Sequence, residues 1–173
     1  REFGIPGNDV QRWVKDWNVR HDFLDPQEYR QLTVAMLSTH DTTNWAAWWE
    51  NEAGTVDEDL FRRKCSDRRR IDFSQIKDKL FDSGFSRHGR LYWKKEIDSI
   101  DKLVAVLARP KEELGDFIAI YRDTYQEKEK FWEKLGLEGK MRHNSDSEII
   151  HKAFKMLFNS NAVFCINSIF DYL

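Results

Sequence analysis

Two short apolar runs at either side of a long helical stretch constrain the fold of this chain most strongly. They are LTVAML at residues 32–37 and AVFCI at residues 162–166. Each run is apolar on both faces, which is typical of parallel strands buried in a sheet. A weaker strand candidate, VQRWV at residues 10–14, follows the turn-forming segment GIPGND. Strands that flank a helical stretch favour a parallel sheet or barrel over a free helical bundle.

Helical spacing of apolar residues fills most of the chain between these runs. Trp45, Trp48 and Trp49 share one helical face, and residues 41–44 offer capping side chains for that helix. The same pattern predicts further helices at residues 60–61 with a start at Thr55 or Asp57, at 73–80 with an end at Gly84, at 100–107 with a stop at Pro110, at about 110–135, and at 149–157.

The charge balance argues against two classes of partner. The chain carries 28 Lys and Arg residues against 30 Asp and Glu residues, and its formal net charge is -2. We therefore expect no electrostatic attraction to nucleic acid or to an anionic membrane. Basic residues cluster at 62–64 and 68–70, but acidic residues interrupt and flank them, which favours a solvated helix face.

Other classes of site and location are also disfavoured. No apolar run is long enough to span a bilayer, and no signal peptide is recognisable. Cys65 and Cys165 form no metal-type or redox-type pair, so we expect a reducing, cytoplasmic location. The histidines show no metal-ligand spacing, and no Gly-rich phosphate loop is present. We therefore expect neither a metal nor a cofactor.

Polar residues follow the first apolar run at once. Ser38, Thr39, His40 and Asp41 stand where the strand at 32–37 would end. In parallel α/β folds, working residues lie at the carboxyl ends of strands, so this segment is the leading candidate site. A second interpretation stays open, in which Asp41 or Thr42 only caps the helix that carries the tryptophans.

Three segments together resemble one known family. STHDTTNWAAWW at residues 38–49 is similar to the His-Asp segment of the 4-α-glucanotransferases, which are also called amylomaltases or disproportionating enzymes and belong to the α-amylase clan. GIPGNDVQRW at residues 4–13 resembles a Pro-Gly strand segment of that family, and AVFCINSIFDYL at 162–173 resembles its last barrel strand and a following acidic motif. The three segments occur in the family's order.

The resemblance implies a fold and a domain arrangement. The fold class expected is α/β, a partial (β/α)8 barrel with a large helical insert. Residues 1–173 would be the C-terminal portion of the catalytic domain, mostly helical, with a helical excursion at about 57–158. Two or three strands cannot close a barrel of eight. The remainder of the same barrel is therefore expected as a partner outside this chain.

The resemblance also implies a reaction and roles for particular residues. The family transfers α-1,4-glucan segments between maltodextrins by a retaining double displacement that uses three carboxylates. Asp41 matches the carboxylate that stabilises the transition state. His40 and Thr39 match substrate-binding positions, and Trp45 and Asp171 are further candidates for contact with maltooligosaccharides. Phe170 stands where the family commonly has glutamine.

Alternatives remain beside this hypothesis. The other two carboxylates lie outside the matched segments, so this piece alone is expected to be inactive. The three tryptophans can stack on glucose, or they can pack their helix onto the sheet. The chain can also be a non-enzymatic α-helical interaction module with the tryptophans and the basic cluster as its surface, or a degenerate carbohydrate-binding member of the family.

Overall fold

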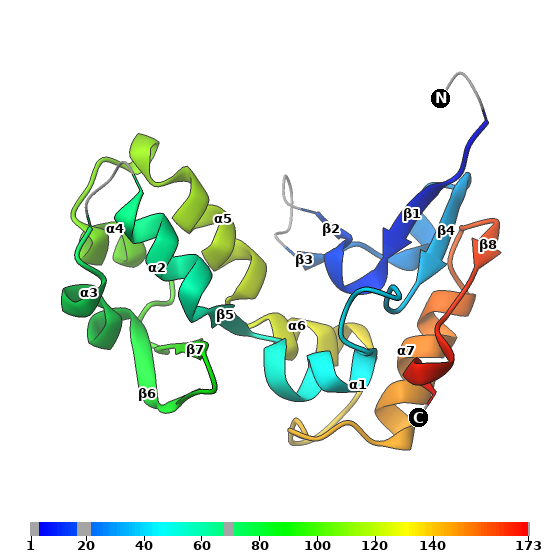
Figure 1. The fold of residues 1–173 in the computed structure, drawn as a ribbon. Coiled ribbons are helices and arrows are strands. Elements are labelled where there is room, and N and C mark those ends of the chain that lie inside the picture. The colour runs from blue at the N-terminus through cyan, green and yellow to red at the C-terminus, as the bar shows by residue number, and fades with distance from the viewer. Residues whose placement is uncertain (1–3, 17–21, 68–70, 173) are drawn as a thin grey trace. The chain divides into compact units, whose positions relative to one another are not determined.

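The computed structural model describes residues 4–16, 22–67 and 71–172 (Figure 1). Arg68, Arg69 and Arg70 of the basic cluster lie outside the described residues. The chain forms two compact units: the first contains Arg1–Glu50 and Lys128–Leu173, and the second contains Asn51–Glu127. The helical excursion predicted at 57–158 does not coincide with this division, because residues 128–158 belong to the first unit.

The first unit is built on a parallel sheet of three strands. Its strands are β1 (Gly7–Val10), β4 (Thr33–Met36) and β8 (Phe164–Cys165), in the order β1-β4-β8. Gly7 pairs with Thr33, and Val34 pairs with Phe164. The unit's remaining elements are η1 (Gln11–Trp13), β2 (Lys15–Asp16), β3 (Asp22–Phe23), η2 (Pro26–Glu28), α1 (Trp45–Ala47), the π-helix η3 (Trp48–Glu52), α6 (Glu127–Lys134), α7 (Ser147–Phe158) and η5 (Ile169–Asp171). Of these, η3 and α6 also include residues of the second unit.

The strand predictions are confirmed at 32–37 and 162–166 and are wrong at 10–14. The strand near the N-terminus ends at Val10, and the residues that follow form the 3-10 helix η1. Central strand β4 is buried on alternate residues, with Ala35 fully enclosed. Strand β8 is less buried than expected, because Phe164 lies at the edge of the described sheet and is 48% exposed.

An aromatic cluster forms the core of the first unit beside the sheet. The rings of Trp45 and Trp49 stack with centroids 5.6 Å apart and planes 8° from parallel. Phe131 of α6 meets Trp45 at 5.9 Å and Phe23 of β3 at 4.5 Å. Buried aromatic side chains supply much of the hydrophobic stabilisation of a small unit. The cluster therefore fixes α1 and α6 to one another and to β3.

The second unit combines helices with an antiparallel sheet of order β5-β7-β6. Its elements are β5 (Thr55–Asp57), α2 (Glu58–Ser66), α3 (Phe73–Leu80), β6 (Phe81–Arg87), β7 (Arg90–Trp93), α4 (Ile100–Leu107), η4 (Lys111–Glu113) and α5 (Gly115–Thr124). Phe61 lies at the centre of its core, where its ring contacts those of Phe81 and Phe117, each at 5.1 Å. The helices predicted at 60–61, 73–80 and 100–107 are confirmed here.

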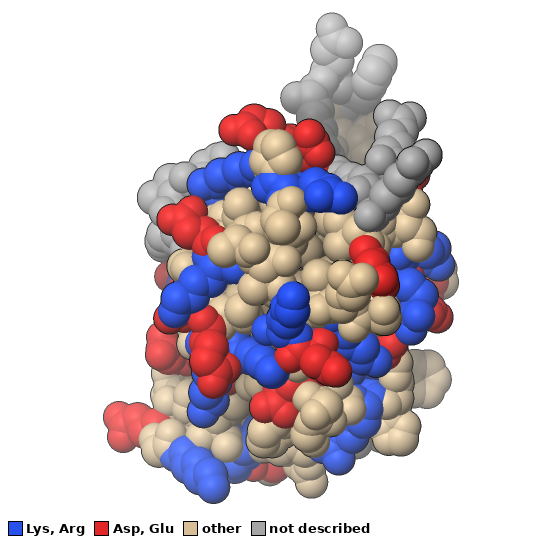
Figure 2. Space-filling model, turned by 90° about the vertical axis from the view of Figure 1, so that its left-hand side faces the viewer, with Lys and Arg blue, Asp and Glu red and all other residues tan. Residues whose placement is uncertain are grey.

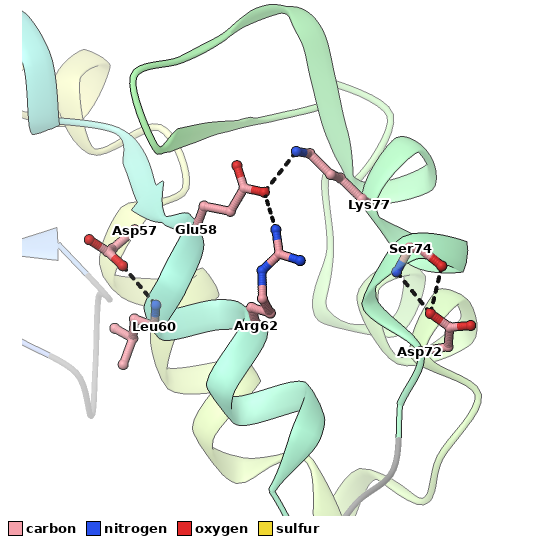
Figure 3. Close-up of polar contacts among 7 residues, drawn as sticks. All are labelled: Asp57, Glu58, Leu60, Arg62, Asp72, Ser74 and Lys77. Atoms are coloured by element: carbon pink, nitrogen blue, oxygen red, sulfur yellow. Dashed lines mark hydrogen bonds and ion pairs between the residues drawn. The ribbon is translucent and has the colours of Figure 1, made fainter.

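Side-chain caps begin the first two helices of this unit (Figure 3). Asp57 accepts a hydrogen bond from the amide of Leu60 at 2.7 Å, which confirms one of the two predicted starts of α2. Asp72 accepts bonds from the amide and hydroxyl of Ser74 at the start of α3. Capping side chains satisfy amides that have no partner inside the helix, and each cap stabilises by about 1 kcal/mol.

Two helix boundaries differ from the prediction. Helix α3 ends at Leu80 rather than Gly84, because residues 81–93 form a hairpin in which Phe81 pairs with Trp93. The helix predicted at 110–135 is three pieces, η4, α5 and α6. Gln126 adopts a φ of 52° between α5 and α6, which breaks the helical hydrogen bonding there.

The architecture is mixed α/β, as predicted. A parallel arrangement of β1, β4 and β8 brings residues from both ends of the chain into one sheet, while α7 leads into β8 (Figure 1). Within the described residues, no helix has the length and apolar character needed to cross a bilayer.

Candidate functional site

The candidate site lies at the carboxyl edge of the parallel sheet. Because β1, β4 and β8 are parallel, the residues after each strand emerge at the same edge. These residues are Gln11–Trp13 after β1, residues 38–44 after β4, and residues 167–171 after β8. The sheet therefore brings together residues that are more than 120 positions apart in the sequence.

The segment after β4 is anchored at both ends by one buried carboxylate. Ser38 Oγ lies 2.8 and 2.7 Å from the two carboxylate oxygens of Asp171 and donates its hydrogen bond to them. The amide of Trp45 donates to Oδ1 of the same residue at 2.8 Å. Asp171 is 1% exposed, at the end of the 3-10 helix η5. Residues 39–44 thus form a loop that leaves and returns to the same point of the fold.

A tight turn occupies the tip of this loop, and we call residues 39–42 the His-Asp turn. The amide of Thr42 donates to the carbonyl of Thr39 at 3.4 Å, and the amide of Thr39 donates to Thr42 Oγ1 at 3.0 Å. His40 and Asp41 are the two central residues of the turn, and both are exposed. The turn therefore presents an imidazole and a carboxylate together at the sheet edge.

The carboxylate of Asp41 is held in its ionised form. The hydroxyl of Thr39 donates a hydrogen bond to Asp41 Oδ1. This bond, a backbone hydrogen bond within Asp41 and the neighbouring His40 lower the pKa of Asp41 below its ordinary value. Asp41 therefore offers a negative charge at neutral pH.

The capping interpretation of Asp41 and Thr42 is wrong. The cap of α1 is Asn44, whose Oδ1 accepts a hydrogen bond from the amide of Ala47 at 2.8 Å. The Thr42 hydroxyl bonds instead within the His-Asp turn. The side chains of Asp41 and Thr42 are thus not explained by the start of the helix.

A cavity of about 290 Å³ lies beside the turn. It is lined by Ser38, Thr39, His40, Thr42, Asn44, Ser168 and Phe170. Asp41 is exposed and is not one of the lining residues. The cavity joins polar groups from the ends of β4 and β8, and Thr39 and His40 are among them.

Arg12 and Asn167 also hold this loop, and the sequence patterns did not identify them. The Arg12 guanidinium, which is 3% exposed, donates to the carbonyl and hydroxyl oxygens of Thr43 at 3.1 and 3.3 Å. Asn167 Oδ1 accepts a hydrogen bond from the amide of Leu37 at 2.9 Å. Each residue follows a strand of the parallel sheet, and that position is the only signal that could have marked it.

The tryptophans after the turn pack in the core rather than line the cavity. Trp45 and Trp49 are fully enclosed, and Trp48 is 4% exposed. By contrast, Trp13 of η1 is 57% exposed and follows β1 at the same edge. Among these indoles, Trp13 alone offers a broad open surface to a ligand.

Charged residues of the second unit are mixed in sign. Glu58 accepts from Arg62 at 2.7 Å and from Lys77 at 2.8 Å (Figure 3). Lys64 lies 3.3 Å from the carboxylate of Asp116. On the face drawn in Figure 2, basic and acidic side chains alternate. Arg62 and Lys64 of the basic cluster are therefore paired with acidic groups, as on a solvated helix face. Across residues 4–16, 22–67 and 71–172, no three His, Cys, Asp or Glu side chains group as metal ligands would.

Comparison with known proteins gives one family. The sequence model of the 4-alpha-glucanotransferase family matches residues 1–173. The 4-alpha-glucanotransferase of Chlamydia pneumoniae is 40% identical over 48 residues, which are 28% of this chain and 9% of that protein. Its counterpart in Chlamydia caviae is 38% identical over 50 residues, which are 29% of this chain and 9% of that protein. The chain thus aligns with about a tenth of the length of these relatives, and no solved structure matches it.

Proposed function

The chain belongs to the 4-alpha-glucanotransferase family, and we propose that Asp41 is the transition-state-stabilising carboxylate of such an enzyme. The enzyme would transfer α-1,4-glucan segments between maltodextrins. The observation that carries the proposal is the His-Asp turn: an exposed, ionised carboxylate beside an exposed imidazole at the carboxyl edge of a parallel sheet. Both relatives named above are 4-alpha-glucanotransferases, which supports the same activity.

The chemistry requires a fixed negative charge near the reacting sugar. When the glycosidic bond breaks, positive charge develops on the sugar ring, and hydrogen bonds to its hydroxyls strengthen. A carboxylate held in place before the reaction stabilises that charge more than it stabilises the ground state. Asp41 supplies the charge, while His40 and Thr39 supply donors and acceptors for sugar hydroxyls at the adjoining cavity.

The reaction proceeds by two displacements. A carboxylate nucleophile forms a covalent glycosyl-enzyme as a general acid protonates the leaving oxygen. The same acid, now deprotonated, then takes the proton of the 4-hydroxyl of a second glucan as that oxygen bonds to the sugar and releases the carboxylate nucleophile. We propose that both groups belong to the remainder of a (β/α)8 barrel, of which β1, β4 and β8 are a part. The exposed edge strand β8 supports this arrangement, because an unpaired apolar edge favours pairing with further strands.

Aromatic contact with glucose is assigned to Trp13 rather than to Trp45. A pyranose ring has an apolar face that stacks on an open aromatic plane. Trp13 is exposed beside the site, whereas Trp45 has no exposed surface.

Two free thiols, Cys65 and Cys165, suit a reducing location, and we propose the cytoplasm.

The test is disproportionation of maltotriose by the full-length protein and its variants. Asp41→Asn should lower kcat by about 10²–10³-fold, since removal of one preorganised stabilising group typically has that effect. Asp101→Asn is the matched control, because its side chain is 91% exposed in the second unit, and it should leave the rate unchanged.

Two outcomes would contradict the proposal. One is an active full-length protein in which Asp41→Asn keeps a near-native rate, which removes Asp41 from catalysis. The other is turnover by residues 1–173 alone, because the nucleophile and general acid are assigned to the remainder of the barrel. An intact but inactive native protein that still binds maltotriose would instead identify a degenerate carbohydrate-binding member.

A further inference from the structure

Asp171 contacts both ends of the loop that carries the His-Asp turn. Its carboxylate bonds Ser38 at the start of the loop and the amide of Trp45 at its end. The residue itself is fixed by η5, where Ser168 caps the helix and accepts a hydrogen bond from the amide of Phe170 at 3.2 Å. One side chain therefore sets the spacing between two points that bracket His40 and Asp41.

We propose that Asp171 is a positioning residue: its buried carboxylate fixes Ser38 against Trp45 and thereby fixes where the His-Asp turn presents Asp41. The proposal rests on the proposed function only for its catalytic consequence. The structural part, that Asp171 orders the loop, stands on the hydrogen bonds alone.

Burial separates this role from direct contact with a sugar. Asp171 is 1% exposed, and both of its carboxylate oxygens have partners inside the first unit. A residue that binds substrate must reach it, whereas His40 and Asp41 are exposed at the tip of the loop. The sequence-based assignment of Asp171 to substrate contact is therefore replaced here by an indirect role.

The neighbouring contacts predict that loss of the Asp171 carboxylate would affect the whole loop. Trp45 is enclosed in the aromatic core, and truncation of Asp171 would remove the acceptor of its buried amide. Ser38 is 4% exposed, and its hydroxyl would likewise lose its acceptor. On the other side of the loop, Arg12 donates to Thr43. Loss of Asp171 would remove hydrogen bonds at both ends of the loop.

The chemistry of the two oxygens predicts which substitution is tolerated. Oδ1 accepts from both Ser38 and Trp45, and Oδ2 contacts Ser38 alone. In Asp171→Asn the amide oxygen can keep both bonds of Oδ1, and the amide nitrogen can donate to Ser38 Oγ. Asp171→Ala keeps none of them. A positioning role thus predicts that asparagine rescues what alanine removes, although it carries no charge.

Two measurements on the full-length protein test this. The first is hydrogen–deuterium exchange of backbone amides, which needs no substrate: Asp171→Ala should exchange faster at Trp45 and throughout residues 39–43, and Asp171→Asn should match the native protein. The second is maltotriose disproportionation. There Asp171→Ala should lower kcat on the order of 10²-fold, the effect of misplacing a catalytic group by about 1 Å, with a smaller change in KM. Asp171→Asn should stay within about tenfold of the native rate.

Ser38→Ala keeps the experiment decisive if Asp171→Ala does not fold. It removes one of the two anchors and leaves the Trp45 bond, so exchange should rise at residues 39–41 but not at Trp45. Unchanged exchange in every variant overturns the positioning role. Equal losses of activity for asparagine and alanine, with the loop still ordered, also overturn it, because the charge itself would then act. If Asp171→Ala exchanges faster but the native protein has no transferase activity, the result contradicts the proposed function and leaves the ordering role intact.

Discussion

Lys128→Met should change how the stability of the first unit depends on pH. Lys128 of α6 is 7% exposed, and its ammonium donates to the carbonyl of His143 at 2.9 Å. It also lies 4.8 Å from the centroid of the Trp49 ring. Burial lowers the pKa of Lys128 from 10.5 to about 8, although the nearby Glu129 and Glu50 act in the opposite direction.

The size of the effect follows from this pKa difference. Below pH 8 the lysine is charged in both states, and the folded state bears the full cost of burying the charge. Between about pH 8 and 10.5 the unfolded chain still binds a proton that the folded chain has released, so stability rises with pH. Each unit of difference corresponds to about 1.4 kcal/mol, and the native protein should gain about 2–3 kcal/mol between pH 7 and 10 from this group. Methionine does not titrate, so the variant should lack this rise.

Urea unfolding followed by tryptophan fluorescence at several pH values measures the difference. The quantity to compare is the free energy of unfolding of the native protein minus that of Lys128→Met. Lys140→Met is the control, because Lys140 is exposed in the same unit, and its curve should parallel that of the native protein. Parallel curves for the native protein and Lys128→Met would refute the reasoning.

Further variants test the site and its surroundings. Thr39→Val removes the hydroxyl that lowers the pKa of Asp41, so the acidic limb of the pH profile of kcat should move to higher pH. Thr39→Ser keeps the hydroxyl and should leave the limb in place. An unmoved limb in Thr39→Val would exclude this hydrogen bond as the cause of the lowered pKa. Trp45→Ala should lower the free energy of unfolding by about 3–5 kcal/mol, as for other enclosed aromatic residues. Trp13→Ala, at an exposed indole, should change stability by only about 0.5 kcal/mol and raise KM for maltotriose, and the reverse pattern would return Trp45 to the substrate-binding set.

Short sequence patterns correctly predicted those strands and helix ends that depend on residues close in the sequence. The run at 32–37 became β4, in which Thr33 and Ala35 are buried and Val34 and Met36 are half-buried. Asp57 marked the start of α2 because a carboxylate before a helix accepts a free amide hydrogen. Pro110 similarly stands beyond the end of α4, which closes at Ala108 in a left-handed conformation.

Other elements depend on contacts that no short window contains. Gly84 resembled a helix terminator, but it lies in β6, whose place depends on pairing with β7. The hairpin between these strands turns through His88 and Gly89, both with positive φ, and only the glycine favours that conformation. Gln126 breaks the predicted long helix with a φ of 52°, although glutamine is ordinarily a good helix former.

The candidate site shows the same division. Its position was predictable, since the polar residues 38–41 directly follow a strand. Its supports were not, because Asp171 meets Ser38 across 133 positions of sequence and Arg12 meets Thr43 across 31. No periodicity links such residues, and only the parallel pairing of three strands brings them together.

The order in which the residues are synthesised determines which of these contacts can form first. The second unit, Asn51–Glu127, is continuous, and the described residues of its hydrophobic core cluster all lie within it. Strand β4 emerges before that unit but gains its second neighbour only when β8 arrives, and Ser38 gains its acceptor only with Asp171. Contacts so distant in sequence form slowly, and domains that are continuous tend to fold first. A nascent chain halted short of Asp171 would therefore contain a folded second unit and an incomplete candidate site.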